Sequence, residues 1–155
     1  MAPAYIALGS NLSDRQHQLD AARAFLGALG TVEACSPVME SEPWGFVSPH
    51  PFLNQVLLLQ TPLSPTELLD ATQDIERRMG RTQKSEAGCY HDRIIDIDLL
   101  FYDNLVMDTP RLVLPHPLLH ERLFVLQPLA AIAPSLVHPR LGLTVTEMLK
   151  KIEKK

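Results

Sequence analysis

The segment that most constrains the fold is 94–102, IIDIDLLFY. Apolar residues alternate with acidic ones in it, which is typical of a β-strand with one buried face. Successive side chains of a strand point to opposite faces, so Asp96 and Asp98 share one face, with Cα atoms about 6.5 Å apart. The apolar residues at 95, 97, 99 and 101 point the other way, toward a core.

The paired aspartates are unusual for a strand. Aspartate is disfavoured in strands, and two like charges side by side repel each other. A divalent cation would offset the repulsion, and hard carboxylate oxygens suit Mg²⁺, which shares its other positions with water and phosphate oxygens. The alternative is a polar stripe that faces solvent.

Strand and helix patterns alternate along the rest of the chain. The predicted strands are 4–9, 31–41, 53–60 and 94–102, the last turning through Asp103 and Asn104 into a hairpin with 105–107. The predicted helices are 14–29 with a stop at Gly30, 65–79 after a cap at Ser64, 123–132, and a C-terminal helix after Thr144. Helices that cross over between strands of one mainly antiparallel sheet predict an α+β, ferredoxin-like fold with helices packed on the sheet.

Length and charge limit the class of protein. The 155 residues correspond to one domain, 1–155. The net charge of 14 − 18 = −4 argues against binding to nucleic acid or to an anionic membrane. The apolar runs are shorter than the ~18 residues of a membrane span. Cys35 and Cys89 form no CxxC motif, so we expect reduced thiols and a cytoplasmic protein.

Basic residues surround the acidic strand in sequence. Because guanidinium groups match phosphate oxygens in pairs, these residues together with the two aspartates suggest Mg²⁺ and a polyphosphate. Any one of them alone would be interpreted as a surface residue. They are Arg77, Arg78, Arg81, Lys84, Arg93, Arg111 and Arg122.

Two other motifs are weaker. His116 and His120 have the spacing of zinc ligands on a helix, but Pro115 and Pro117 disfavour a helix there. We expect His116 to bond a phosphate or a neighbouring backbone group instead. The GSN sequence at 9–11 follows a strand but lacks the pattern of a phosphate-binding loop.

Six strings, in this order, resemble motifs of the 6-hydroxymethyl-7,8-dihydropterin pyrophosphokinases of folate biosynthesis. They cover most of the chain, and the combination of the fifth and the sixth is the most specific. The strings are AYIALGSNLSDR (4–15), SEPWGF (41–46), PFLNQV (51–56), DIERRMGR (74–81), DRIIDIDLLFYD (92–103) and LVLPHPLLHERLFVLQPLAAIAP (112–134).

The resemblance implies a reaction in which ATP transfers its terminal diphosphate to the hydroxymethyl group of the dihydropterin and AMP is released. It also implies two Mg²⁺ ions held by Asp96 and Asp98. Such ions would neutralise the triphosphate and help to align the attacking hydroxyl. ATP and the pterin are then the small-molecule partners, and we expect a monomer that binds neither nucleic acid nor membrane.

The resemblance also implies a pterin site. Phe52 and Phe124 would sandwich the pterin ring, although core packing is the simpler interpretation of each phenylalanine alone. Asn54 would bond the polar edge of the ring, helped by the backbone around Glu42 and Gly45.

The remaining roles implied by the resemblance concern ATP and catalysis. The ATP site would be lined by Gln73, Glu76, Arg93, Arg111, His116 and Arg122. Arg81, Arg93, Asp96 and Asp98 would be the catalytic residues. Arg81 would lie at the base of the loop 82–92, which closes over the substrates in the family. This loop departs from many relatives, because Gln83 replaces an arginine and Tyr90 stands in for a tryptophan; Lys84 would supply a point charge instead.

Two other classes of protein fit the sequence less well. A ferredoxin-like module that binds a nucleotide without turnover would not need the aspartate pair. An RNA-binding ferredoxin-like domain would carry a basic surface and a characteristic aromatic string, and this chain has neither.

Overall fold

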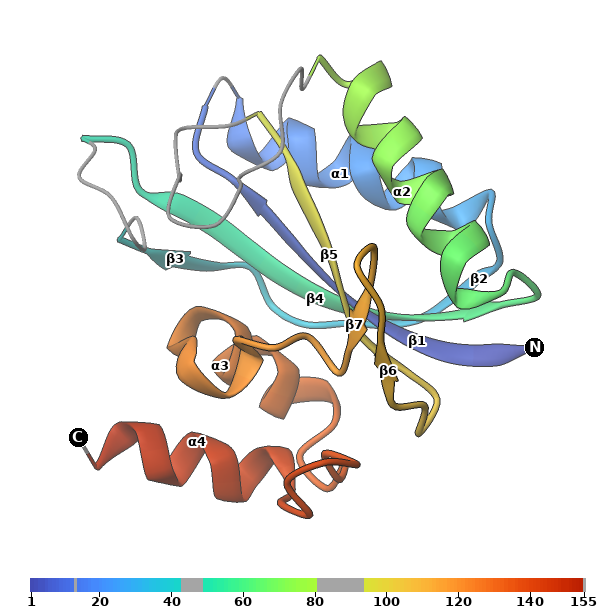
Figure 1. Cartoon of the computed structure of the whole chain (residues 1–155). Helices are drawn as coiled ribbons and strands as arrows, with labels where there is room; N and C mark the ends of the chain where they lie inside the picture. The colour runs from blue at the N-terminus through green and yellow to red at the C-terminus, as the bar shows by residue number, and fades with distance from the viewer. Residues whose placement is uncertain (13, 43–48, 81–93, 155) are drawn as a thin grey trace.

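The computed structural model describes residues 1–12, 14–42, 49–80 and 94–154. Its main element is a five-stranded antiparallel sheet in the order β2-β4-β1-β5, with β3 also paired to β4 (Figure 1). The strands are β1 (Ala2–Ser10), β2 (Thr31–Cys35), β3 (Met39–Ser41), β4 (Phe52–Thr61) and β5 (Asp96–Tyr102). Helix α1 (Arg15–Gly27) follows β1, and α2 (Pro65–Arg78) connects β4 to β5. This topology confirms the predicted ferredoxin-like α+β fold.

The two faces of the sheet are covered by different helices (Figure 1). Helices α1 and α2 pack on one face, over a core that includes Ile6, Leu57 and Ile97. Helices α3 (Leu123–Ile132) and α4 (Val145–Glu153) cover part of the other face, over a second core that includes Val56 and Phe101. Side chains alternate between the two faces along each strand, so they contribute to two cores, one on each face of the sheet. Polar residues on the second face lie beside the layer formed by α3 and α4.

Local signals explain where the helices begin and end. The Ser64 hydroxyl accepts the backbone N–H of Glu67 at 3.2 Å, and the Glu67 carboxylate accepts the N–H of Ser64 at 2.9 Å, so the predicted capping box is confirmed. Gly80 follows α2 with a φ of 98°, a conformation that glycine adopts without strain. Thr144 and Glu147 form the same reciprocal cap at the start of α4.

Gly30 has a different role from the predicted helix stop. Helix α1 ends at Gly27, with Ala28 as its C-cap. A Cβ on Gly30 would lie 2.0 Å from the carbonyl oxygen of Gln60. A side chain is therefore excluded at position 30 by the close approach of the β4 backbone.

The prediction of one continuous strand over 31–41 is wrong. This segment forms two strands, β2 and β3, separated by 36–38 and both paired with β4. Pro37 lies in the gap and has no N–H for a ladder hydrogen bond. The flanking Ser36 still binds β4, since its N–H donates to the carbonyl of Val56 at 2.8 Å and its hydroxyl accepts the N–H of Val56.

The predicted hairpin after β5 is also wrong. Residues Met107–Asp108 form β6, which pairs with β7 (Val113–Leu114) and not with β5. The two favoured types of two-residue hairpin turn need positive φ at both central residues or at the first one alone. Asp103 has a φ of 53°, whereas Asn104 does not have a positive φ. The turn therefore forms, but it does not return the chain along β5.

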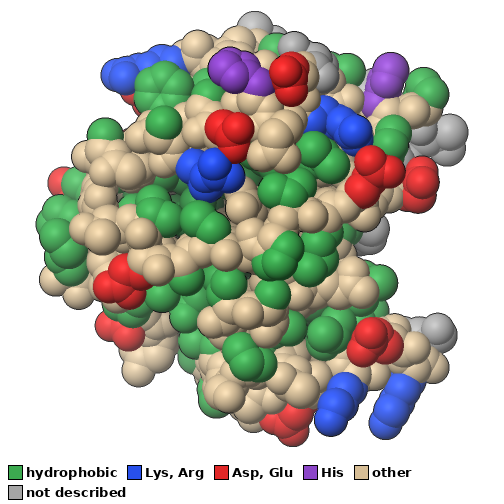
Figure 2. Space-filling view, turned by 180° about the vertical axis from the view of Figure 1, so that it is seen from behind, with side chains coloured by type: hydrophobic (Ala, Val, Ile, Leu, Met, Phe, Trp, Pro, Cys, Tyr) green, Lys and Arg blue, Asp and Glu red, His purple; other side chains and the backbone are tan. Residues whose placement is uncertain are grey.

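The surface of the described residues carries both signs of charge. Seen from behind, acidic and basic side chains are interspersed over the molecule (Figure 2). Cys35 is an exposed free thiol, as expected, whereas Cys89 lies outside the described residues. Among the described helices, none is both long and apolar enough to cross a membrane.

Candidate functional site

Two rows of residues cross the sheet where β5 begins. In the first row, Gly9 of β1 lies between Asn54 of β4 and Asp96 of β5. In the second row, Ala7 lies beside Asp98. Residues directly opposite each other on paired strands project to the same face, so Asn54, Asp96 and Asp98 share one face. Because Gly9 has no side chain, nothing from β1 rises between the amide and the first carboxylate.

This face is the one that α3 and α4 cover only in part. Farther along β5, Leu100 and Phe101 are both buried in the second core. The prediction that residue 101 shares the face of 95, 97 and 99 is therefore wrong, because a register shift against β1 interrupts the alternation of the strand there. Asp96 and Asp98, by contrast, are only half-buried. The pair of carboxylates therefore lies at the margin of the helical layer, where a ligand can reach it.

The aspartate pair has the donor chemistry of a Mg²⁺ site that is completed by its substrate. Within the described ranges, no group of three or more potential metal-binding side chains occurs. Two carboxylates are what Mg²⁺ commonly takes from a protein when water and phosphate oxygens supply the other positions. The residues present thus fit the predicted metal, with oxygen ligands still to come from a phosphate compound.

Phe52 and Asn54 both lie at Gly9. A Cβ built on Gly9 would be 3.5 Å from Cδ1 of Phe52 and 3.6 Å from Oδ1 of Asn54. The ring of Phe52 and the amide of Asn54 therefore lie on the same side of β4. Phe124 is half-buried on α3, which packs against β3 and β4, and the guanidinium carbon of Arg122 lies 5.7 Å from the centre of its ring.

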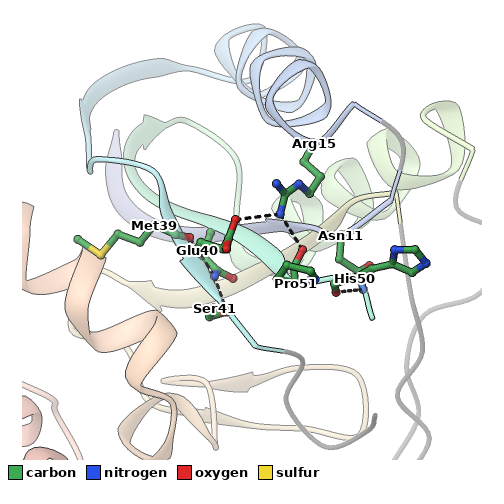
Figure 3. Close-up of polar contacts among 8 residues, drawn as sticks. Asn11, Arg15, Met39, Glu40, Ser41, His50 and Pro51 are labelled. Carbon is green, nitrogen blue, oxygen red and sulfur yellow. Dashed lines mark hydrogen bonds and ion pairs between the residues drawn. The ribbon is translucent and has the colours of Figure 1, made fainter. Parts of the chain in front are cut away.

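The orientation of the Asn54 amide is fixed by its neighbours. Its Nδ2 donates to the carbonyl of Met39 at 3.2 Å and to the hydroxyl of Ser41 at 2.7 Å (Figure 3). A carbonyl can only accept, so the NH₂ group must point toward β3. Oδ1 then faces Gly9 and can accept a hydrogen bond from an N–H at the edge of a ligand.

Ser41 is a site residue that the sequence did not single out. It is the first residue of the SEPWGF string, but a serine beside a proline-rich loop has no signature of its own. Its role follows from the β3–β4 register, which pairs Ser41 with Phe52 and places its hydroxyl beside Asn54. A short strand such as β3 is hard to detect from sequence.

Glu76 lies on the face of the sheet opposite to the one that carries Asp96 and Asp98. It comes from α2, is buried, and accepts the backbone N–H of Ile97 at 2.8 Å. Ile97 stands between Asp96 and Asp98 on β5, which is the last strand in the sheet order. Glu76 therefore binds the outer edge of the strand that presents both carboxylates.

The other predicted ATP residues that the structure describes lie on α2, between β6 and β7, and between β7 and α3. Gln73 is half-buried on α2. Arg111, between β6 and β7, forms an ion pair with Asp70, which is also on α2. His116 donates its backbone N–H to the carbonyl of Leu100 on β5 at 2.9 Å. Its Nδ1 accepts the N–H of Leu118 at 3.2 Å, so the predicted bond to a neighbouring backbone group is confirmed. Arg122 is a buried residue at the start of α3.

Of the remaining predicted site residues, the structure describes only Glu42, which is exposed just after β3. The others lie outside the described residues, and their proposed roles stay predictions. They are Gly45, Arg81, Gln83, Lys84, Tyr90 and Arg93.

Comparison with known proteins identifies a family. The family model for 7,8-dihydro-6-hydroxymethylpterin-pyrophosphokinase (HPPK) matches residues 5–134. The 2-amino-4-hydroxy-6-hydroxymethyldihydropteridine pyrophosphokinase of Porphyromonas gingivalis is 50% identical over 141 residues, which are 90% of this chain and 95% of that protein. The protein of the same name from Bacillus subtilis is 44% identical over 131 residues, covering 83% of this chain and 77% of that protein.

Solved structures show the same fold in longer chains. An HPPK-DHPS protein in complex with substrates has a TM-score of 0.77 and 13% identity, covering 97% of this chain and 43% of that one. HPPK-DHPS of Plasmodium falciparum with pteroate has a TM-score of 0.77 and 16% identity, covering 97% and 42%. This chain thus spans less than half the length of these solved chains, and at such identities the likeness supports the fold alone.

The sequence matches carry more than the fold. They run in one alignment from β1 into α3 and so include every strand of the main sheet. The two relatives are matched along most of their own length. The chain therefore belongs to the 7,8-dihydro-6-hydroxymethylpterin-pyrophosphokinase family.

Proposed function

We propose that this protein transfers a diphosphate group from ATP to the hydroxymethyl group of 6-hydroxymethyl-7,8-dihydropterin, a step of folate biosynthesis. The observation that carries the proposal is the row Asn54–Gly9–Asp96. It brings an amide suited to a heterocycle edge and a carboxylate suited to a cation onto one face, with no side chain between them. Membership of the pyrophosphokinase family supports the same reaction.

Asp96 and Asp98 are proposed to hold two Mg²⁺ ions. When bound, such ions neutralise charge on the triphosphate and polarise the phosphorus that is attacked. The protein contributes the spacing of the two carboxylates, which β5 fixes because both side chains project to one face. Glu76 supports this spacing through its bond to the backbone of Ile97.

The pterin is proposed to lie between Phe52 and Phe124. Aromatic faces hold a flat heterocycle, and hydrogen bonds at its rim give orientation. Asn54 offers its Oδ1 to an N–H of the ring, since its NH₂ group is held by β3. The backbone around Glu42 and Gly45 is proposed to complete the rim.

The chemistry is proposed to be a direct displacement. The hydroxymethyl oxygen attacks the β-phosphorus of ATP, the bond from that phosphorus to the oxygen of the α-phosphate breaks, and AMP leaves as the hydroxyl proton is released. Positioning and charge stabilisation dominate such transfers. The residues proposed to bind ATP or stabilise the transferring group are Gln73, Glu76, Arg81, Arg93, Arg111, His116 and Arg122.

The reaction is proposed to need one copy of the domain 1–155. The proposed state of the protein in solution is a monomer. The free thiol of Cys35 is in keeping with a reducing cytoplasm. Light scattering at micromolar concentration tests the monomer, with a mass near 17.3 kDa as the expected result.

An AMP-release assay separates an enzyme from a module that only binds nucleotide. The protein is incubated with ATP and Mg²⁺, with and without the dihydropterin. We expect AMP only when the pterin is present, and a loss of AMP in Asp98→Asn. Tight ATP binding without AMP in the complete mixture would favour the binding module.

A further inference from the structure

Arg15 makes two contacts that the reaction does not explain. It is the first residue of α1, and its Nη1 donates to the carbonyl oxygen of Pro51 at 2.9 Å (Figure 3). The same nitrogen lies 3.3 Å from a carboxylate oxygen of Glu40. Arg15 therefore joins the start of a helix to two segments that are far away in sequence.

Both contacts fall next to the proposed pterin site. Pro51 directly precedes Phe52, and Glu40 directly precedes Ser41. The β3–β4 register pairs Ser41 with Phe52, and Ser41 also holds the amide of Asn54. One arginine thus contacts both segments of this pairing. One contact lies just before Phe52, which would face the pterin, and the other lies just before Ser41, which holds the amide of Asn54.

The two contacts differ in strength. Glu40 is more than half exposed, and exposed ion pairs contribute little to stability. The bond to Pro51 is a charge-assisted hydrogen bond to a partly buried backbone carbonyl, which is the stronger type. The bond to Pro51 is therefore the main restraint, and it acts on the backbone that leads into Phe52.

A neighbour restrains the same segment. Asn11, which is buried between β1 and α1, donates its Nδ2 to the carbonyl of His50 at 3.0 Å. The corner between β1 and α1 thus binds two successive carbonyls, those of His50 and Pro51, just before β4 begins (Figure 3). The two hydrogen bonds restrain the direction in which the chain enters β4.

We propose that Arg15 is a positioning residue of the pterin site, acting through Pro51 on Phe52 and through Glu40 on Ser41. This inference rests on the proposed function, because it takes Phe52 and Asn54 as pterin ligands. Arg15 touches no substrate in this proposal. It keeps the aromatic ring and the amide in the relative position that the flat heterocycle needs.

The chain offers a matched control. Arg23 lies two turns farther along α1, and its side chain is 31% exposed, as is that of Arg15. It pairs with Asp20 and donates to the side chain of Gln55 on β4 at 2.9 Å. Gln55 is the neighbour of Asn54 in the strand and so projects to the other face, toward α1. Arg23 therefore connects α1 to β4 through a side chain on the opposite face of the sheet, and not through the backbone that leads into Phe52.

The experiment measures binding of the dihydropterin, in the presence of a non-hydrolysable ATP analogue and Mg²⁺, to wild type, Arg15→Ala, Arg15→Lys and Arg23→Ala. We expect Arg15→Ala to weaken pterin binding about threefold to tenfold, the size of one lost hydrogen bond. Arg15→Lys should recover part of the loss, because an ammonium can still donate to Pro51. Affinity for the ATP analogue alone should stay within about twofold in every variant.

Hydrogen exchange of the free proteins gives a second readout. The amides of His50 and of residues 52–54 should exchange faster in Arg15→Ala than in wild type; Pro51 has no amide N–H. In Arg23→Ala the same amides should exchange as in wild type. The proposal would be overturned if Arg15→Ala matched wild type in both pterin affinity and amide exchange. It would also be overturned if Arg23→Ala lost as much pterin affinity as Arg15→Ala. Failure of wild type to bind the pterin would instead reject the proposed function, and with it the role of Arg15.

Discussion

The carboxylate of Glu76 accepts the backbone N–H of Ile97 at 2.8 Å, and Ile97 is the residue between Asp96 and Asp98. A buried side chain of α2 thus restrains the strand that carries both proposed metal ligands. The bond gives an acceptor to a backbone N–H of β5, the last strand in the order of the described sheet.

Substitution of Glu76 should affect both stability and activity. Glu76→Ala leaves the N–H of Ile97 without its acceptor, so we expect about 1–3 kcal/mol lower free energy of unfolding and a lower kcat. Glu76→Gln keeps an acceptor oxygen and should lose less stability. Urea denaturation with steady-state kinetics measures both effects. An equal free energy of unfolding for wild type and Glu76→Ala would show that the bond from Ile97 to Glu76 does not stabilise the fold.

Asp96→Asn and Asp98→Asn should each lose activity while keeping the fold. Removing one carboxylate from a site for two cations should reduce turnover at least ~10²-fold, about 2.7 kcal/mol of barrier. The melting temperature should stay the same or rise, because repulsion between like charges is removed. Asp103→Asn, just past the end of β5, is the matched control and should remain active. Near-normal turnover of either variant at saturating Mg²⁺ would refute the assignment.

Phe52→Ala and Phe124→Ala should weaken the pterin more than the nucleotide. The loss of a stacking face should cost about 1–3 kcal/mol of pterin affinity, judging by stacking of bases on aromatic side chains. Separate titrations with the pterin and with an ATP analogue measure the difference. Phe25→Ala, on the exposed side of α1, should change neither affinity. Equal weakening of both ligands would mean that the two phenylalanines are core residues.

Gly9→Ala should fold normally and bind the pterin poorly. The φ of Gly9 lies outside the left-handed region, and the added Cβ would meet Phe52 and Asn54 at ordinary contact distances. Alanine in a strand should then raise stability by about 0.4–1 kcal/mol. The same Cβ fills the space that the ring is proposed to use, so pterin affinity should fall about tenfold. Gly27→Ala, where nothing lies within 4 Å, is the control. Unchanged pterin binding by Gly9→Ala would place the ring elsewhere.

His138 should make stability depend on pH. Burial lowers the pKa of its ring, with smaller contributions from His120 and Arg140, and its Nδ1 accepts two backbone N–H groups. A histidine with a lowered folded-state pKa contributes stability above its ordinary pKa of about 6.5, and that stability is lost as pH falls through the folded value. Urea midpoints at pH 7.5 and 5 should therefore fall less in His138→Asn than in wild type. The exposed His17→Asn should behave as wild type, and an equal fall in all three would exclude His138.

Much of the fold could be predicted because its signals are local. The alternation around Asp96 and Asp98 depends only on strand geometry, and the caps at Ser64 and Thr144 are formed within four residues. Part of the candidate site could be predicted from the sequence for the same reason. The two-residue spacing of Phe52 and Asn54 sets their common face whatever they pack against.

The parts that could not be predicted depend on distant partners. Gly30 is required by the backbone of Gln60, thirty positions away, and β6 pairs with β7 instead of turning back along β5. The proposed roles of Ser41 and Arg15 depend on the pairing of β3 with β4 and on the contacts of the first residue of α1 with Glu40 and Pro51. No local pattern encodes such contacts.

Identification of the products by mass tests the central claim most directly. The protein is incubated with ATP, Mg²⁺ and 6-hydroxymethyl-7,8-dihydropterin, and both products are quantified in the same sample. The account predicts AMP and the pterin diphosphate ester in equal amounts. ADP with a pterin monophosphate, or recovery of both substrates unchanged, would contradict it.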